Sequence, residues 1–167
     1  MKIVVLERNS VGTDTPVDCL GEFGSLTCYP NTVTVEEVRE RVKDADIIVA
    51  NKTPMREETL KDAPNVKLIC EFATGFDNCD LAYCKSRGIK VANVVDYSTA
   101  MVAQHTFTLA LALSQKLIHY DNYVKSGAYA AQDRFSNFDL PFTELDGKTW
   151  GIVGMGNIGK RVARIAT

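Results

Sequence analysis

Short apolar runs that alternate with amphipathic segments are the feature that most restricts the fold of this chain. The runs predict buried strands at residues 2–6, 46–50, 66–72 and 89–94. The intervening segments predict helices after residue 34, over residues 55–63 and over residues 80–87. Strands that alternate with helices indicate an α/β fold built on a parallel sheet. We therefore expect a compact flavodoxin-like lobe up to about residue 95.

Polar residues mark where two of these helices should begin. Thr34 and Glu37 have the spacing of a capping box, in which each side chain binds the other's backbone N–H. Asp80 stands where it can cap the helix over residues 80–87, and Gly88 follows that helix where a positive φ is wanted. Both patterns support the predicted helix boundaries.

A longer helix is expected next, starting at Ser98 as its N-cap and running to about Lys125. The segment has no glycine or proline before Gly127, and its apolar residues fall on more than one face. A helix that is apolar most of the way round is usually buried between layers. We expect it to connect two lobes, followed by irregular residues over 127–148 and a strand over 148–153.

The charge balance of the chain excludes several classes of protein. Nineteen Lys and Arg stand against 21 Asp and Glu, for a net charge of −2 and a pI near 5.7. No block of like charge suggests binding to nucleic acid or to a membrane surface.

The first apolar run is too short for a signal peptide, and no stretch approaches the ~20 apolar residues of a membrane span. A cytoplasmic protein is expected.

Five cysteines, an odd number, are spread along the first half of the chain at Cys19, Cys28, Cys70, Cys79 and Cys84. A metal site is not expected, because zinc sites use tighter pairs of cysteine and histidine. Reduced and mostly buried thiols are the simpler expectation.

A G-x-G-x-x-G pattern stands at Gly154, Gly156 and Gly159, after an apolar run and before an amphipathic segment. This strand–turn–helix context is typical of dinucleotide binding. Gly154 permits the tight turn, Gly156 lets a pyrophosphate approach the backbone, and Gly159 lets helix and strand pack closely. The free N–H groups at the helix start, near Asn157 and Ile158, would receive the phosphates. A glycine-rich turn without a ligand is the alternative.

The pattern also suggests how the chain is divided. We expect a lobe over residues 1–97, an interdomain helix over 98–126, and the start of a Rossmann dinucleotide-binding domain over 127–167. The acidic residue that binds the cofactor ribose is expected about 20 residues beyond the turn, outside this chain. The cofactor is therefore expected to be NAD or NADP, without a distinction between them.

Three segments carry a family resemblance: residues 73–80 (ATGFDNCD), 97–106 (YSTAMVAQHT) and 145–159 (LDGKTWGIVGMGNIG). With these motifs in order, the chain resembles the D-isomer-specific 2-hydroxyacid dehydrogenases along its whole length. The second segment is most similar to the glycerate dehydrogenase and hydroxypyruvate reductase branch, and lactate-type enzymes are close. The resemblance implies an NAD(P)-dependent oxidoreductase that acts on a small 2-hydroxy or 2-keto acid, with NAD as the family default.

The resemblance also implies substrate-binding residues in the first lobe. Backbone N–H groups of Thr74 and Gly75, with Phe76 beside them, would hold the substrate carboxylate, because such a turn forms an anion nest. A plain turn is the alternative. Asn51 and Lys52 end an earlier strand on the same edge, where ligands gather in such sheets. Lys52 is equally well explained as a solvated surface charge.

In the long helix, the resemblance places Val102 near the nicotinamide, with simple core packing as the alternative. His105 and His119 are expected to be structural, since the family's catalytic histidine lies after the glycine turn. The Arg that binds the carboxylate and the Glu that orients the histidine lie there too. No catalytic residue and no metal ligand is therefore assigned within this chain.

Two interpretations follow for the chain as a whole. It is expected to be a fragment of such a dehydrogenase, inactive alone, whose intact form could be a homodimer assembled through the nucleotide domain. The alternative is a naturally short, non-catalytic binding or assembly module. The coding sequence after codon 167 would distinguish the two.

Overall fold

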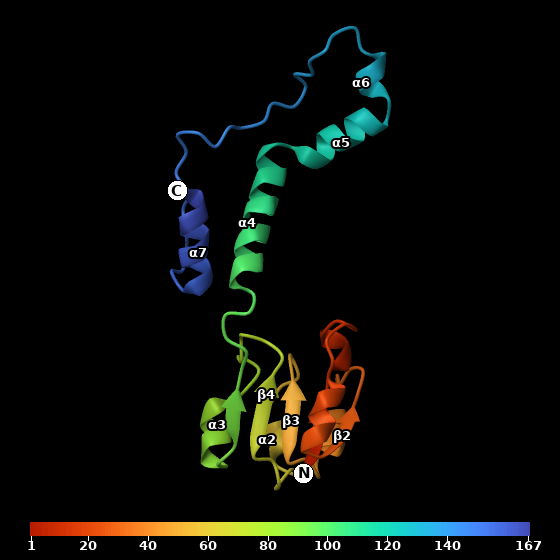
Figure 1. The fold of residues 1–167 in the computed structure, drawn as a ribbon, viewed down its shortest axis with the longest axis vertical. Coiled ribbons are helices and arrows are strands. Elements are labelled where there is room, and N and C mark those ends of the chain that lie inside the picture. The colour runs from red at the N-terminus through yellow and green to blue at the C-terminus, as the bar shows by residue number, and fades with distance from the viewer. The chain divides into compact units, whose positions relative to one another are not determined.

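The computed structural model describes residues 1–167, which form two compact units, Met1–Val95 and Asp96–Thr167. The first unit contains a five-stranded parallel sheet with the strand order β2-β1-β3-β4-β5 (Figure 1). Its strands are β1 (Lys2–Val5), β2 (Ser25–Cys28), β3 (Ile47–Ala50), β4 (Leu68–Glu71) and β5 (Lys90–Ala92). This order is that of flavodoxin-like folds. The predicted α/β class with a flavodoxin-like parallel sheet is confirmed.

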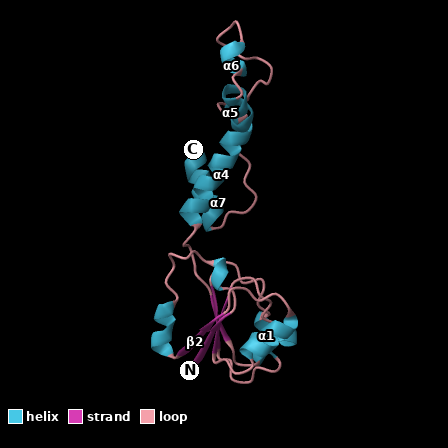
Figure 2. Cartoon of the chain, turned by 90° about the vertical axis from the view of Figure 1, so that its right-hand side faces the viewer, coloured by secondary structure: helices cyan, strands magenta, loops and turns pink.

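Three α-helices cover one face of this sheet, and a short 3-10 helix lies on the other (Figure 2). The covering helices are α1 (Val35–Val42), α2 (Glu57–Leu60) and α3 (Leu81–Ser86). The 3-10 helices are η1 (Arg8–Ser10) and η2 (Asp18–Phe23), of which η2 packs through Leu20 on the opposite face. The main core therefore lies between the sheet and the three α-helices.

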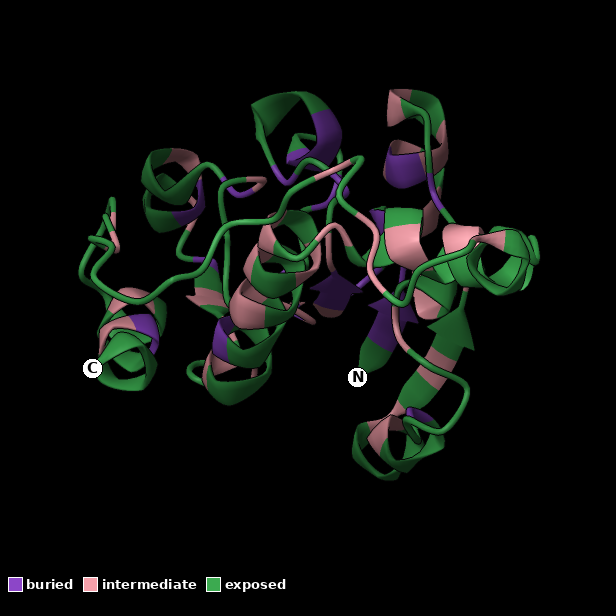
Figure 3. Ribbon diagram, turned by 90° about the horizontal axis from the view of Figure 1, so that it is seen from above, coloured by how far each residue is buried: buried purple, intermediate pink, exposed green.

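The core residues follow the predicted pattern. Val38 and Val42 of α1 are buried against Leu6 and Ile48 of the sheet. Figure 3 shows buried residues in strands of the sheet. Burial of such side chains stabilises the fold by about 1.5–3 kcal/mol each, which is why the apolar runs predict the strands.

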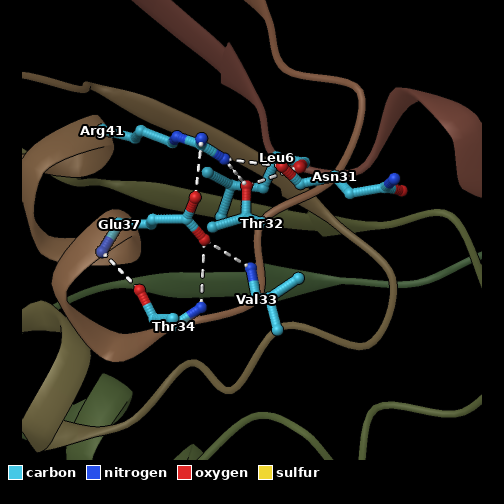
Figure 4. A network of polar contacts seen from close by, with 7 residues as sticks. All are labelled: Leu6, Asn31, Thr32, Val33, Thr34, Glu37 and Arg41. Carbon is cyan, nitrogen blue, oxygen red and sulfur yellow. Dashed lines mark hydrogen bonds and ion pairs between the residues drawn. The ribbon is translucent and has the colours of Figure 1, made fainter.

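The start of α1 is fixed by a network of polar contacts (Figure 4). Thr34 and Glu37 form the predicted capping box, with Glu37 N–H donating to Thr34 Oγ1 at 3.2 Å and Thr34 N–H donating to Glu37 Oε2 at 3.1 Å. The Arg41 guanidinium donates to Thr32 Oγ1 at 2.6 Å, and that hydroxyl donates to the Leu6 carbonyl at 2.6 Å. The helix is thereby tied to the end of β1.

The second unit is helical, with α4 (Thr99–Ser114), α5 (Leu117–Lys125), α6 (Ala128–Ala131) and α7 (Asn157–Ala166). The single helix predicted over residues 98–126 is wrong. The chain breaks between α4 and α5 at Lys116, whose φ of 54° is left-handed. The carbonyl of Ser114 leaves the helical pattern there and accepts a hydrogen bond from Thr143 N–H at 3.3 Å. Ser98 occupies the N-cap position without a capping hydrogen bond.

Two other expectations for this unit are wrong. Of α4, only Ala103 is buried, whereas Leu109 and Leu113 are exposed, so the helix is not enclosed between layers. Residues 148–153 form no strand, because no neighbouring strand is present to pair with them. Trp150 instead stacks on Phe107 of α4, with 4.6 Å between ring centroids.

The cysteines only partly match the expectation of mostly buried thiols. Cys79 and Cys84 are buried and Cys70 is half-buried, but Cys19 and Cys28 are exposed, and all five are free thiols. These two lie in η2 and in the edge strand β2, where little covers them. None of the helices is both long enough and apolar enough to cross a membrane.

Candidate functional site

The carboxyl ends of parallel strands meet at one edge of the sheet, which is where ligands bind in open α/β folds. In the first unit, Glu7 follows β1 closely, residues 51–55 follow β3, and residues 72–80 follow β4. The predicted substrate residues belong to the last two segments. This edge is therefore the candidate substrate site.

Glu7 holds the segment after β3 through its backbone. Its Oε2 accepts hydrogen bonds from the N–H groups of Asn51, Lys52 and Thr53 at 2.7, 2.9 and 3.0 Å. Burial acts to raise the pKa of Glu7, but these backbone hydrogen bonds outweigh it and hold the pKa below its ordinary value. Glu7 is thus an ionised carboxylate seated in a nest of three consecutive donors.

The contact with Glu7 limits which groups of Asn51 and Lys52 can bind a ligand. Their N–H groups are already bound to Glu7, so only their side chains remain to donate hydrogen bonds to a ligand. Asn51 is half-buried and Lys52 is exposed. Glu7 itself is absent from the predicted site, although its position directly after the first apolar run places it at this edge.

The turn after β4 is open to solvent at the predicted positions. Thr74, Gly75 and Phe76 are exposed, and their N–H groups donate to no other group of the chain. The Thr74 hydroxyl donates to the Val94 carbonyl at 2.9 Å, and the Asn93 side chain donates to the Thr74 carbonyl at 2.7 Å. The turn is therefore anchored through its other polar groups, while three consecutive N–H donors are left free.

Gly75 does not need to be glycine for the sake of the backbone. Its φ is not positive, and a Cβ there would meet only a carboxylate oxygen of Asp77, at 3.6 Å. The space above this residue is open. A ligand can therefore approach the backbone closely at this point.

A buried carboxyl lies at the base of the same turn. Glu71 is 2 % exposed, and its Oε1 accepts hydrogen bonds from Asn78 Nδ2 and Cys79 Sγ, each at 3.0 Å. Burial raises the pKa of Glu71, against the effect of these two hydrogen bonds. Burial and the contact with Glu71 also raise the pKa of the Cys79 thiol, which keeps its proton and donates it. Sequence reasoning missed Glu71, although a lone Glu inside an apolar run was a signal.

The second unit contains the glycine turn. Gly154 has a φ of 95°, and a Cβ on Gly159 would lie 2.0 Å from the Gly154 carbonyl oxygen. Gly156 is the N-cap of α7 and has open space around it, and Asn157 and Ile158 are the first residues of the helix. These positions fit the roles of tight turn, close approach and close packing that the pattern predicts.

A hollow of about 280 Å³ lies beside this turn within the same unit. Its lining includes the cations Lys160, Arg161 and Arg164 of α7 and one carboxylate, Asp96, so positive charge predominates, which is consistent with a ligand that carries negative charge. Val102 lies on α4 and is 39 % exposed. His105 is exposed on the same helix.

Comparison with known proteins identifies the family. The family model described as D-isomer specific 2-hydroxyacid dehydrogenase, catalytic domain, matches residues 3–161. The chain belongs to this family. The predicted family membership is thereby confirmed.

Other members of the 2-hydroxyacid dehydrogenase family are similar over nearly the whole chain. A glycerate dehydrogenase of Methylorubrum extorquens is 38 % identical over 99 % of this chain, and a hydroxypyruvate reductase of Blautia hydrogenotrophica is 37 % identical over 99 %. A D-lactate dehydrogenase of Aquifex aeolicus, solved with NAD and lactic acid, superposes with a TM-score of 0.78 at 32 % identity, covering 99 % of this chain and 48 % of that one. The chain spans about half the length of the curated relatives, 52 % of each.

Proposed function

We propose that the protein is an NAD(P)-dependent oxidoreductase that interconverts a 2-hydroxy acid and the matching 2-keto acid, with glycerate and hydroxypyruvate as the favoured pair. The names of the similar glycerate dehydrogenase and hydroxypyruvate reductase support this choice. Because the chain spans about half of those relatives, hydride transfer is proposed for the protein as a whole. For the residues in hand, the proposal concerns substrate binding and the first part of the cofactor site.

The observation that carries the proposal is the row of free N–H donors at Thr74, Gly75 and Phe76. Consecutive backbone N–H groups bind anions, and the substrates of this family carry a carboxylate. We assign the carboxylate to the N–H groups of Thr74 and Gly75. The side chains of Asn51 and Lys52 would add an amide and a positive charge at the same edge.

The glycine turn is assigned to the cofactor. Its open Gly156 and the free N–H groups of Asn157 and Ile158 suit a pyrophosphate, with Gly154 and Gly159 shaping the turn. A bound nicotinamide dinucleotide would supply or accept the hydride. Val102 on α4 is assigned to the nicotinamide, following the family resemblance. Proton transfer is not assigned to a residue of this chain.

Substitution of Gly75 tests the proposal. Gly75→Ala adds a methyl group to the middle residue of the three free N–H donors, and the fold has room for it. We expect hydroxypyruvate to bind about tenfold more weakly by titration calorimetry, as when a hydrogen bond to a charged group is lost. The melting temperature should change little.

Gly21→Ala is the matched control, because Gly21 also lacks a positive φ and has open space around it. It lies in η2, on the face of the sheet opposite the three α-helices, and is not part of the turn after β4. Hydroxypyruvate should bind this variant as it binds the unaltered chain. Equal affinity in the Gly75→Ala and Gly21→Ala variants, or no binding to the unaltered chain, would contradict the proposal.

A further inference from the structure

The candidate substrate edge contains two sets of consecutive backbone donors, and only one of them is free. The N–H groups of residues 74–76 have no partner, whereas those of residues 51–53 converge on Glu7. A row of three N–H groups around one carboxylate is an anion-binding nest. In the nest at residues 51–53, the anion is a side chain of the protein itself.

The segment that Glu7 holds is joined to the substrate turn by several hydrogen bonds. Asn78 Nδ2 donates to the Thr53 carbonyl at 3.0 Å, and Met55 N–H donates to the Asn78 carbonyl at 2.9 Å. Asp80 N–H then donates to the Met55 carbonyl at 2.9 Å. These hydrogen bonds therefore join residues 53–55 and 78–80 into one piece.

Glu71 holds the same piece from the end of β4. Its Oε1 accepts from the Asn78 amide that also reaches Thr53. The path from Glu7 through Thr53 and Asn78 to Glu71 is thus continuous, and Thr53 and Glu71 within it are buried. The free donors at residues 74–76 lie between Glu71 and Asn78 in the chain, so this path fixes both ends of their turn.

We propose that Glu7 is a positioning residue for substrate binding: by filling the nest at residues 51–53, it orients the turn at residues 74–76 and leaves that turn as the one carboxylate site on this edge. The inference rests on the proposed function, because it concerns the same substrate turn. Glu7 acts through residues 51–55 and 78 and is not assigned a contact with the substrate. Its negative charge also deters a second carboxylate from the filled nest.

The decisive variant is Glu7→Gln, which keeps the size of the side chain but removes its charge and replaces one of the two carboxylate oxygens with an NH2 group that cannot accept. Glu37→Gln is a matched control. Glu37 likewise accepts from two consecutive N–H groups, those of Val33 at 2.9 Å and Thr34 at 3.1 Å, but it holds the start of α1. In both variants, consecutive backbone N–H groups thus lose a charged acceptor.

We expect Glu7→Gln to weaken hydroxypyruvate binding about tenfold and Glu37→Gln to change it less than about twofold. The amide protons of residues 51–53 should exchange faster with solvent in Glu7→Gln, while those of Ile48 and Ile69 in the core strands stay protected. Unchanged affinity in Glu7→Gln, or an equal loss in the two variants, would overturn the inference. If the unaltered chain does not bind hydroxypyruvate at Thr74 and Gly75, the proposed function fails first and takes this inference with it.

A second variant tests the nest without reference to the substrate. Glu7→Ala vacates the nest, which formate is small enough to fill. Formate should then restore slow exchange at residues 51–53 and shift their amide signals, and it should leave those signals unaffected in the unaltered chain. No response to formate in Glu7→Ala would show that residues 51–53 do not form an anion-binding nest.

Discussion

The pKa values of two carboxyl groups near the substrate turn are moved in opposite directions by their surroundings. Three backbone N–H groups favour the ionised form of Glu7 and lower its pKa, although burial acts against them. Burial favours the neutral form of Glu71 and raises its pKa, although Asn78 and Cys79 donate hydrogen bonds to it. Hydrogen bonding therefore determines the direction of the pKa shift of Glu7, and burial determines that of Glu71.

Glu71→Gln should stabilise the protein at neutral pH. A carboxyl whose pKa is higher in the folded state binds its proton more tightly there, so stability is lost as pH rises above the unfolded value. Gln avoids this loss and still offers a carbonyl oxygen to Asn78 and Cys79. We expect the free energy of unfolding in urea at pH 7 to rise by about 1 kcal/mol, the lower end of the cost of burying a polar group.

The pH dependence of the stability difference tests whether the pKa of Glu71 causes it. The stability difference between Glu71→Gln and the unaltered chain should shrink toward zero below about pH 4, where the carboxyl is protonated in both states. A variant that is less stable at neutral pH, or a difference that does not change with pH, would count against a raised pKa of Glu71.

The sequence predicts some of these residues but not others. Thr74 and Gly75 stand in a motif that can be recognised directly, because turn chemistry is local. Glu7 is separated from Asn51 by 44 positions, and only the pairing of β1 with β3 brings them together. The burial of Glu71 likewise depends on the helices that cover the sheet, so its role could not be predicted from the neighbouring sequence.

At the scale of elements, the sequence predicted those helix ends that depend on interactions between neighbouring residues. Thr34 and Asp80 cap α1 and α3 as expected, and Gly88 has a positive φ of 71°. Strand β2 was missed because it is a short edge strand with little apolar character. The strand expected over residues 148–153 has no neighbour. Strands depend on distant partners, which a local pattern does not reveal.

Gly159→Ala tests the packing of the glycine turn against α7. The new Cβ would lie 2.0 Å from the Gly154 carbonyl oxygen, so the helix start must move. We expect a loss of about 1–3 kcal/mol, typical of overpacking, measured as faster amide exchange along α7. Gly156→Ala is the control, because its new methyl group would have no neighbour within 4 Å and its φ is −72°. Equal effects of the two substitutions would refute this account of Gly159.

At the scale of the whole molecule, the two units differ in how much core they possess. In the first unit, residues from β1, β3 and β4 and from α1, α2 and α3 form a shared buried cluster around Ile48 and Ile69, and Val91 of β5 packs against it. In the second unit, Ala103 and Val162 are the buried apolar residues. Since burial of apolar surface is the main stabilising contribution, the first unit accounts for most of the stability of this chain. It also holds the proposed substrate turn.

The central claim is that the carboxylate of a 2-keto acid binds the N–H groups of Thr74 and Gly75. The most direct test is to titrate the isotope-labelled chain with hydroxypyruvate and follow its backbone amide signals. Hydroxyacetone, which has a methyl group in place of the carboxylate, is the control ligand. We predict saturable shifts that are largest at Thr74, Gly75 and Phe76 with hydroxypyruvate and absent with hydroxyacetone. Equal shifts with both ligands, or shifts centred elsewhere, would contradict the claim.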